Sequence, residues 1–330
     1  MIHVHCGDSS AATLRQSGIP GDVIVWTELL VDGPTPGGVA ADEWRRLRAR
    51  FLSDSTRGVL SFDDCRRRLA TQDEALARCL DADEVALWFD ACLFDQSILI
   101  RQLDWFDRQE MRGRVSLICV SGYPGFVRFT GLGELDPVQM AALLPSRHAV
   151  TPSERQFGRR AWEAFCASEP AALEQVAADQ AAPLPFVCLA LRRQLEQYPS
   201  VRTGLSRLQR ETLQAVVAGK HDLSSIFVAA SRAEERPYFG DTTLWRCLDQ
   251  MASARASLVR IDGPGPLPLW DPPRDLSAWA VYPTATGERV LRGDDHHVRL
   301  NGIDEWRGGV HLRPGNLWLW DELEARLVKG

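Results

Sequence analysis

The sequence lacks several features that would place it in a class at once. It has no apolar run approaching the length of a membrane span, no internal repeat and no low-complexity tract. It also lacks an excess of positive charge, since its 330 residues carry a formal net charge of -6. This balance argues against a generic binder of nucleic acid or of anionic membranes, so we expect no membrane partner.

Paired cysteines are missing as well. The 8 cysteines are scattered, no two form a C-x-x-C pair, and most lie among apolar neighbours. We therefore expect buried free thiols in a reducing compartment, and a cytoplasmic protein. With 45% hydrophobic and 25% charged residues the chain has ample material for a core, and its length predicts two or three domains.

Residues 1–130 alternate short apolar runs with helical patterns. Strands are expected over 2–6, 23–27, 84–89 and 115–120, and helices over 11–17, 41–52, 63–80 and 95–109. Nearly continuous apolar runs are typical of strands covered on both faces. The alternation predicts an α/β fold, with a parallel sheet between two helix layers in a Rossmann-like domain.

The character of the sequence changes after residue 130. Residues 131–200 predict a helical region, and residues 201–330 predict a winged-helix-like α+β domain of three helices (205–219, 222–232 and 241–252) followed by a β-ribbon. The third of these helices carries two Asp and one Arg, whereas a helix entering a DNA groove should be basic or neutral. A protein partner for this domain is therefore favoured over DNA.

Polar or glycine-rich loops follow all four expected strands. In an open α/β sheet, ligands bind outside the carboxyl ends of the strands. We therefore expect a small anionic ligand there, such as a nucleotide or a phosphorylated metabolite. The candidate catalytic residues are Asp8, Ser9, Asp90 and Asp95. The candidate ligand contacts are Gly7, Ser10, Glu28, Gln96, Ser121 and Gly122, with Arg45 and Arg48 as anion clamps on one side of a helix.

The Asp8-Ser9 turn has three interpretations. Its side chains cap the following helix, its backbone cradles an anion, or Ser9 is a nucleophile. An Asp beside an anion requires a metal or an Arg between them. Gly7-Asp8-Ser9 resembles the nucleophile block of the Gly-Asp-Ser-Leu hydrolases, and residues 294–297 offer that family's Asp-x-x-His spacing, although inside the expected ribbon.

His3 and His5 share one face of the first strand. With Asp90 they offer a metal site, and packing inside the protein is the alternative. Taken together, the residues favour no metal and specify no cofactor, and they leave open whether the protein is an enzyme.

Several short segments together resemble a known family. They are His3-Val4 with Gly7-Asp8-Ser9, Val23-Ile-Val-Trp26 with a following Gly-Pro, Trp44 with Arg48, Leu87-Trp-Phe89 with Phe94-Asp-Gln96, Gly131-Leu-Gly-Glu-Leu135, and Leu184-Pro-Phe186. The pattern is similar to the DUF1835 domain family, bacterial proteins of unassigned function, over about residues 1–125. Where the family usually reads Glu-His-Asp, this chain has Asp90-Ala91-Cys92, and the resemblance implies no activity.

Two functions of different classes follow from these observations. One is a protein that binds a small anionic molecule at the sheet edge, either as an enzyme or as a binding protein. The other is a ligand-responsive regulatory or protein-interaction protein that uses its winged-helix-like domain.

Overall fold

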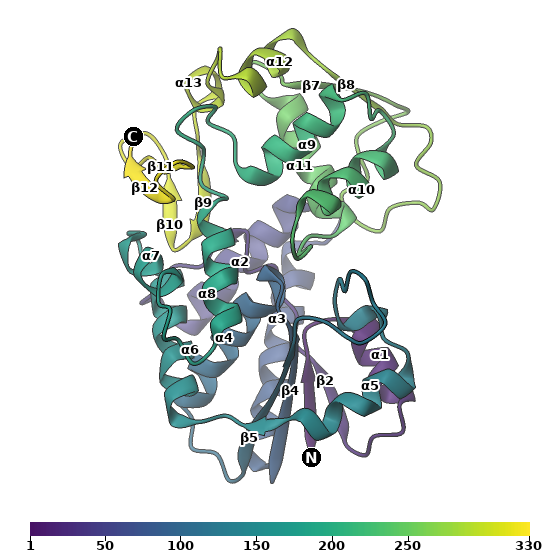
Figure 1. Ribbon diagram of the computed structural model, residues 1–330, viewed down its shortest axis with the longest axis vertical. Coiled ribbons are helices and arrows are strands. Elements are labelled where there is room, and N and C mark those ends of the chain that lie inside the picture. The colour runs from purple at the N-terminus through teal and green to yellow at the C-terminus, as the bar shows by residue number, and fades with distance from the viewer.

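A five-stranded sheet is the centre of the N-terminal part of the computed structural model, which describes residues 1–330 (Figure 1). Its strand order is β2-β1-β4-β5-β6, parallel except for β6. The strands are β1 (Ile2–His5), β2 (Asp22–Val25), β4 (Glu84–Asp90), β5 (Arg114–Val120) and β6 (His148–Ala149). The four expected strands are confirmed. The sequence did not indicate β6 because both of its residues are exposed.

Helices cover both faces of this sheet, as the strand composition predicts. All seven residues of β4 are buried, because the strand lies in the middle of the sheet between two helix layers. One face packs against α3 (Phe62–Ala77) and α4 (Leu93–Asp107), and the other against α1 (Asp8–Gln16) and α5 (Pro137–Leu143). α2 (Ala41–Ser55) packs on α3 rather than on the sheet.

The expected helical region adds a further layer on α4. It contains α6 (Pro152–Phe165), α7 (Ala171–Ala177) and α8 (Pro185–Leu195), which share the main hydrophobic core with the sheet. α6 begins at a capping box in which Thr151 and Glu154 bond each other's backbone N–H groups. Three short 3-10 turns lie at Arg78–Asp81, Leu132–Glu134 and Leu144–Ser146.

Residues 205–301 form a second unit, which we call the C-terminal unit (Figure 1, upper part). Its core is a second hydrophobic cluster, to which Val31, Cys92, Leu93 and Ala190 of the first unit also contribute. Three helices, α9 (Arg207–Val217), α10 (Leu223–Ala233) and α11 (Asp241–Ser253), precede an antiparallel ribbon of β7 (Val259–Asp262) and β8 (Ala280–Pro283). α12 (Ala285–Arg292) and α13 (His297–Asn301) follow. Three helices and a ribbon were expected here, and the finer winged-helix assignment stays a prediction.

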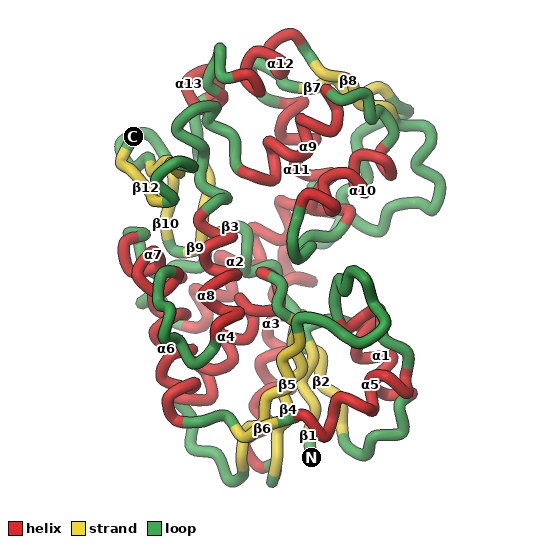
Figure 2. The backbone as a smooth tube through the Cα atoms, in the orientation of Figure 1, coloured by secondary structure: helices red, strands yellow, loops and turns green.

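The end of the chain returns to the first core. The last strands are β9 (Glu305–Gly308), β10 (Val310–Leu312), β11 (Trp318–Asp321) and β12 (Arg326–Lys329). β9 pairs with β10 and with the two-residue strand β3 (Gly33–Pro34), and Val310, Leu312 and Trp320 belong to the core of the sheet. Figure 2 shows these strands apart from the central sheet. The main hydrophobic core therefore contains residues from both sides of the domain boundaries that the sequence predicts at residues 130 and 200.

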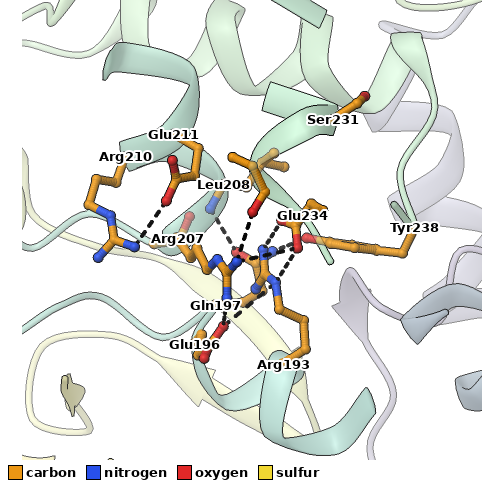
Figure 3. A network of polar contacts seen from close by, with 12 residues as sticks. Arg193, Glu196, Gln197, Arg207, Leu208, Arg210, Glu211, Ser231, Glu234 and Tyr238 are labelled. Carbon is orange, nitrogen blue, oxygen red and sulfur yellow. Dashed lines mark hydrogen bonds and ion pairs between the residues drawn. The ribbon is translucent and has the colours of Figure 1, made fainter. Parts of the chain in front are cut away.

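A polar network joins the two units (Figure 3). Arg193 of α8 donates to both carboxylate oxygens of Glu234, at 2.8 and 2.5 Å, and Glu196 accepts from Arg207 of α9 at 2.6 Å. Glu234 follows α10 and is buried, so this ion pair is largely shielded from water. The network fixes α8 against the C-terminal unit.

None of the helices combines the length and the apolar character that a membrane crossing requires.

A second buried ion pair fixes the segment after β2. Arg48 of α2 donates to both oxygens of Glu28, at 2.7 Å each, and both side chains are almost fully buried. The same guanidinium donates to the backbone carbonyls of Leu29, Asp32 and Pro34. All five N–H groups of Arg48 thus have an acceptor, which is what a buried guanidinium requires.

Removing one partner of this pair should therefore be costly. We expect Arg48→Met to lower the free energy of unfolding by about 3–5 kcal/mol, because Glu28 is left buried and charged without a partner. The double variant Glu28→Gln/Arg48→Met should lose less free energy of unfolding than Glu28→Gln and Arg48→Met lose when their separate losses are added. Urea unfolding measures both. Arg46→Met, which removes an exposed pair with Glu43, is the control and should match the wild type. If the double variant loses as much stability as the two single variants together, Glu28 and Arg48 do not stabilise the fold as a pair.

Candidate functional site

The carboxyl edge of the sheet contains a topological switch point. β1 lies between β2 and β4, so the chain leaves β1 toward one side and later returns to its other side. Ligands of open α/β sheets bind in the crevice at such a point. Gly7–Ser10 follows β1, and β4 ends at Asp90 with Ala91 and Cys92 after it, so two of the expected loops lie side by side here.

The turn after β1 presents a helix N-terminus without a side-chain cap. Gly7 occupies the N-cap position, and no side chain accepts a hydrogen bond from the first turn of α1. The interpretation of Asp8 or Ser9 as a cap is therefore wrong. Both side chains are exposed, whereas Ser10 turns inward, donates to the Gly7 carbonyl at 3.2 Å and lies 3.1 Å from His5 Nδ1. The free N–H groups of this turn favour an anion.

The histidines of β1 are packed inside the protein. Trp88 donates its indole N–H to His3 Nδ1 at 3.1 Å and stacks on the His5 ring. Burial lowers the pKa of His5 to about 3, so its ring is neutral and bonds Ser10 rather than Ser9. His297 bonds Asn301 in α13 of the other unit. No histidine contacts Ser9, which leaves the nucleophile interpretation without a base.

Two carboxyl groups and two thiols meet where β1 and β4 end and α4 begins. The Cys6 thiol donates to Asp95 Oδ1 at 2.8 Å, and the Asp90 backbone N–H donates to Asp95 Oδ2 at 2.7 Å. The Cys92 N–H donates to Asp90 Oδ1 at 2.8 Å. Burial raises the pKa of Asp95, and the neighbouring Asp90 carboxyl raises it further; burial also raises the pKa of Asp90. The pair therefore holds a proton more tightly than ordinary carboxyls do.

This buried cluster (Cys6, Asp90, Cys92 and Asp95) is closed by a glycine loop. A Cβ on Gly131, whose φ of 146° suits glycine, would lie 2.6 Å from Asp90 Oδ2. Gln96 donates to the Asp90 carbonyl and to the Cys119 sulfur. Asp90, Cys92 and Asp95 offer potential metal-ligand atoms within 4.8 Å of one another, but protein donors already occupy both oxygens of Asp95 and one of Asp90. We interpret the cluster as a hydrogen-bonded support for the two loops.

The remaining expected contacts lie in other places. Glu28 and Arg48 bond each other, so neither has a polar atom left for an anion. Arg45 pairs with Asp42 and Asp73 beside a different cavity. Ser121 and Gly122 are exposed after β5. The 131–133 loop thus lies against Asp90 and Ser9, and Asp95 accepts a hydrogen bond from the Asp90 N–H. Asp8 instead lines a cavity beside β2 and α3.

Open space lies on the β2 side of this edge. A cavity of about 600 Å³ runs from Asp8 along β2 to α3, and a second of about 310 Å³ continues to the N-terminus of α11. Thr27, Leu60, Arg68 and Gln72 line both. We call the two together the β2 groove. It lies where α3 of the first unit faces Thr242 and Thr243 of α11.

No protein-family model matches the sequence, and no curated protein matches it. The resemblance to the DUF1835 family therefore stays a prediction.

Sequence reasoning missed Arg68 and the cysteines of the buried cluster. Arg66, Arg67 and Arg68 are consecutive on an amphipathic helix and nothing in the sequence singles out the third. The cysteines were expected to be buried, which is confirmed for all but the half-buried Cys119. Their apolar neighbours gave no sign that Cys6 and Cys92 would meet Asp95.

The raised pKa of Asp95 predicts that the difference in stability between the wild type and Asp95→Asn depends on pH. The pKa of Asp95 is raised in the folded state, so the unfolded chain releases this proton first once the pH exceeds about 4. The free energy of unfolding of the wild type should therefore fall relative to that of Asp95→Asn as the pH rises from about 4 to 7. Urea unfolding at several pH values measures the difference.

Asp95→Ala is the control for hydrogen bonding. It leaves the Cys6 thiol and the Asp90 N–H without an acceptor and should cost about 1–3 kcal/mol. A wild-type stability that rises relative to Asp95→Asn over the same pH range would show that Asp95 is ionised in the folded protein.

Proposed function

We propose that the protein binds a small organic anion, a nucleotide or a phosphorylated metabolite, in the β2 groove. The observation that carries this proposal is Arg68. Its side chain is exposed, lines both cavities of the groove, and has no carboxylate partner. A guanidinium offers an N–H fork that matches phosphate and carboxylate oxygens.

The other cations of the groove are already paired. Arg67 bonds Asp64, and Arg246 bonds Asp32. Glu28, which lines the smaller cavity, bonds Arg48. Arg68 is consequently the one cation of the groove that is free to bind a ligand. It can also offset the repulsion between the Asp8 carboxylate and a bound anion.

The rest of the groove suits the non-ionic part of such a ligand. Leu52, Leu60, Leu69 and Leu269 give the smaller cavity an apolar wall, and the Trp270 ring lies 5.8 Å from the Arg68 guanidinium. Thr27 and Gln72 add polar groups, with Gln72 Oε1 held by the Thr27 N–H at 2.6 Å. An apolar pocket with a few polar groups is typical of small-molecule sites.

Binding is the role that the geometry supports better than catalysis. Asp8 lines the groove, and Ser9 lies beside Gly133. Asp90 and Asp95 are buried in hydrogen bonds and line neither cavity. Of the four candidate catalytic residues, only Asp8 therefore lines the groove.

A ligand screen tests the proposal. We expect at least one nucleotide or phosphorylated metabolite to raise the Tm, because a ligand that binds only the native state stabilises it by mass action. Arg68→Ala should weaken the binding of that compound about tenfold or more in isothermal titration calorimetry. Arg66→Ala is the matched control, an exposed Arg on α3 outside both cavities, and should bind as the wild type does. Equal binding by both variants would refute the proposal.

Asp8 provides a second test with the same compound. Its carboxylate has no cationic partner within the protein and lies at the end of the groove. Asp8→Asn should therefore strengthen binding of a free anion about twofold to fivefold at low salt, by removing a repulsive charge. Titration in EDTA and in Mg²⁺ completes the test. Weaker binding by Asp8→Asn, seen only with Mg²⁺, would mean that a cation bridges Asp8 and the ligand.

A ligand-responsive interaction protein is the second candidate. Thr242, Thr243 and Arg246 of α11 line the smaller cavity, so an occupant would touch both units. Leu244–Leu248 of α11 is buried and Arg246 bonds Asp32 of the first unit. A helix held in this way is not free to enter a DNA groove, and we expect no retardation of arbitrary DNA at low salt.

A further inference from the structure

An arginine in the middle of α4 has no hydrogen-bond acceptor for its N–H groups. Arg101 of α4 is half-buried and forms no ion pair or side-chain hydrogen bond. Its guanidinium carbon instead lies 6.0, 5.8 and 5.7 Å from the ring centres of Trp26, Trp44 and Trp162. Aromatic faces stabilise a cation but accept none of its five N–H groups in the usual way.

Arg101 lines a cavity of about 680 Å³, which we call the tryptophan cavity. The Gly37-Gly38 loop, α2, α4 and α6 form its walls, and the Trp44, Trp105 and Trp162 rings line it. Arg101 is eight residues from the start of α4, or about 12 Å along the helix axis, so the cavity lies away from the carboxyl edge. It shares no lining residue with the β2 groove.

The other charges of the tryptophan cavity are paired. Arg45 bonds Asp73 at 3.0 Å, and the Trp26 indole N–H donates to the same carboxylate at 3.3 Å. Arg108 bonds Asp104 at 2.7 Å and Glu163 at 3.1 Å. Arg101 is therefore the one cation of the cavity that forms no ion pair, although the Asp73 and Asp104 carboxylates act on it electrostatically.

We propose that the tryptophan cavity binds an aromatic carboxylate, with the carboxylate on Arg101 and the ring against the tryptophans. A carboxylate matches the two-pronged guanidinium fork, and the indole faces match a planar ring. The ligand carries a single charge, because Asp73 and Asp104 stand beside Arg101 and repel a second one. Burial lowers the pKa of Arg101, yet a guanidinium stays protonated at neutral pH and a bound carboxylate would compensate for its lost hydration.

Calorimetric titration of the full chain tests this site with defined probes. Benzoate, 2-naphthoate and indole-3-acetate are the carboxylates, 2-naphthamide is the neutral analogue, and 2-naphthyl phosphate is the dianion. We expect saturable one-to-one binding of at least one carboxylate. The amide and the phosphate should bind about tenfold more weakly or worse. Failure of all three carboxylates to bind saturably would overturn the proposal.

Variants locate the bound carboxylate. Arg101→Met should weaken binding by a factor on the order of tenfold to a hundredfold, and Arg101→Lys, which keeps the charge but not the fork, by less. Arg155→Met, on α6 but outside the cavity, is the control and should bind normally. Undiminished binding by Arg101→Met would place the ligand elsewhere and overturn the proposal.

Stability separates loss of the site from loss of the fold. Because Met removes a half-buried charge that has no partner, the Tm of ligand-free Arg101→Met should equal or exceed that of the wild type. Weakened binding at an unreduced Tm supports a binding role. A lower Tm with unchanged carboxylate affinity would make Arg101 a structural residue and overturn the proposal.

Discussion

The buried ion pair between Glu28 and Arg48 is the constraint on which the arrangement of the two units depends. It holds the segment from residue 28 to 35, and this segment contacts α8, α11 and β9. Asp32 bonds Arg246 of α11 and lies 3.7 Å from Arg307 of β9, and the Val31 carbonyl accepts from Gln194 of α8. Gly33 and Pro34 pair with β9. A buried pair stabilises little by itself compared with apolar packing, but it tolerates only one geometry, because each polar atom needs its partner. The pair therefore fixes the position from which α11 and the C-terminal strands are held.

Ion pairs within the protein also determine which charged side chains remain available to bind a ligand. The chain carries 38 Lys and Arg residues, and most arginines near the cavities are bonded to carboxylates of the protein. Arg48 had the right spacing and the right place beside a glycine-rich loop, yet its donors are all used internally. Arg68 and Arg101 differ in having none of these partners. The distinction between a structural and a binding arginine is therefore a matter of its neighbours in space and not of its sequence pattern.

The parts of the fold that could be predicted are those decided by short-range pattern. Glu84–Asp90 contains an unbroken apolar run, and Ile2–His5 alternates apolar residues with histidines. Polar or glycine-rich residues follow both, in Gly7–Ser10 and from Asp90 to Cys92, so both the sheet and its polar edge could be predicted from the sequence. The pairing of Glu28 with Arg48, twenty residues away, depends on how α2 leaves the sheet and has no local signature. The same is true of Val310 and Trp320, which rejoin the first core after a whole unit has intervened. Arg101 had a faint signal, a lone cation within the apolar sequence of α4, but its meaning required the three tryptophans from α2, α6 and the end of β2.

The β2 groove lies beside the switch point of the sheet and not in it, because a loop of the protein fills the crevice there. The rule for open α/β sheets places a ligand between the ends of β1 and β4. Here the 131–133 loop occupies that position, with Gly131 against Asp90 and Gly133 beside Ser9. Space at the carboxyl edge is left on the other side of β1, bounded by Asp8, β2 and α3. The uncapped end of α1 borders both places, so its free N–H groups still favour an anion there. The buried carboxyls of Asp90 and Asp95 would repel an anion in the crevice if ionised, whereas Arg68 would attract the proposed ligand in the groove. The charges and the free volume therefore both favour the side of the sheet on which the ligand is proposed to bind.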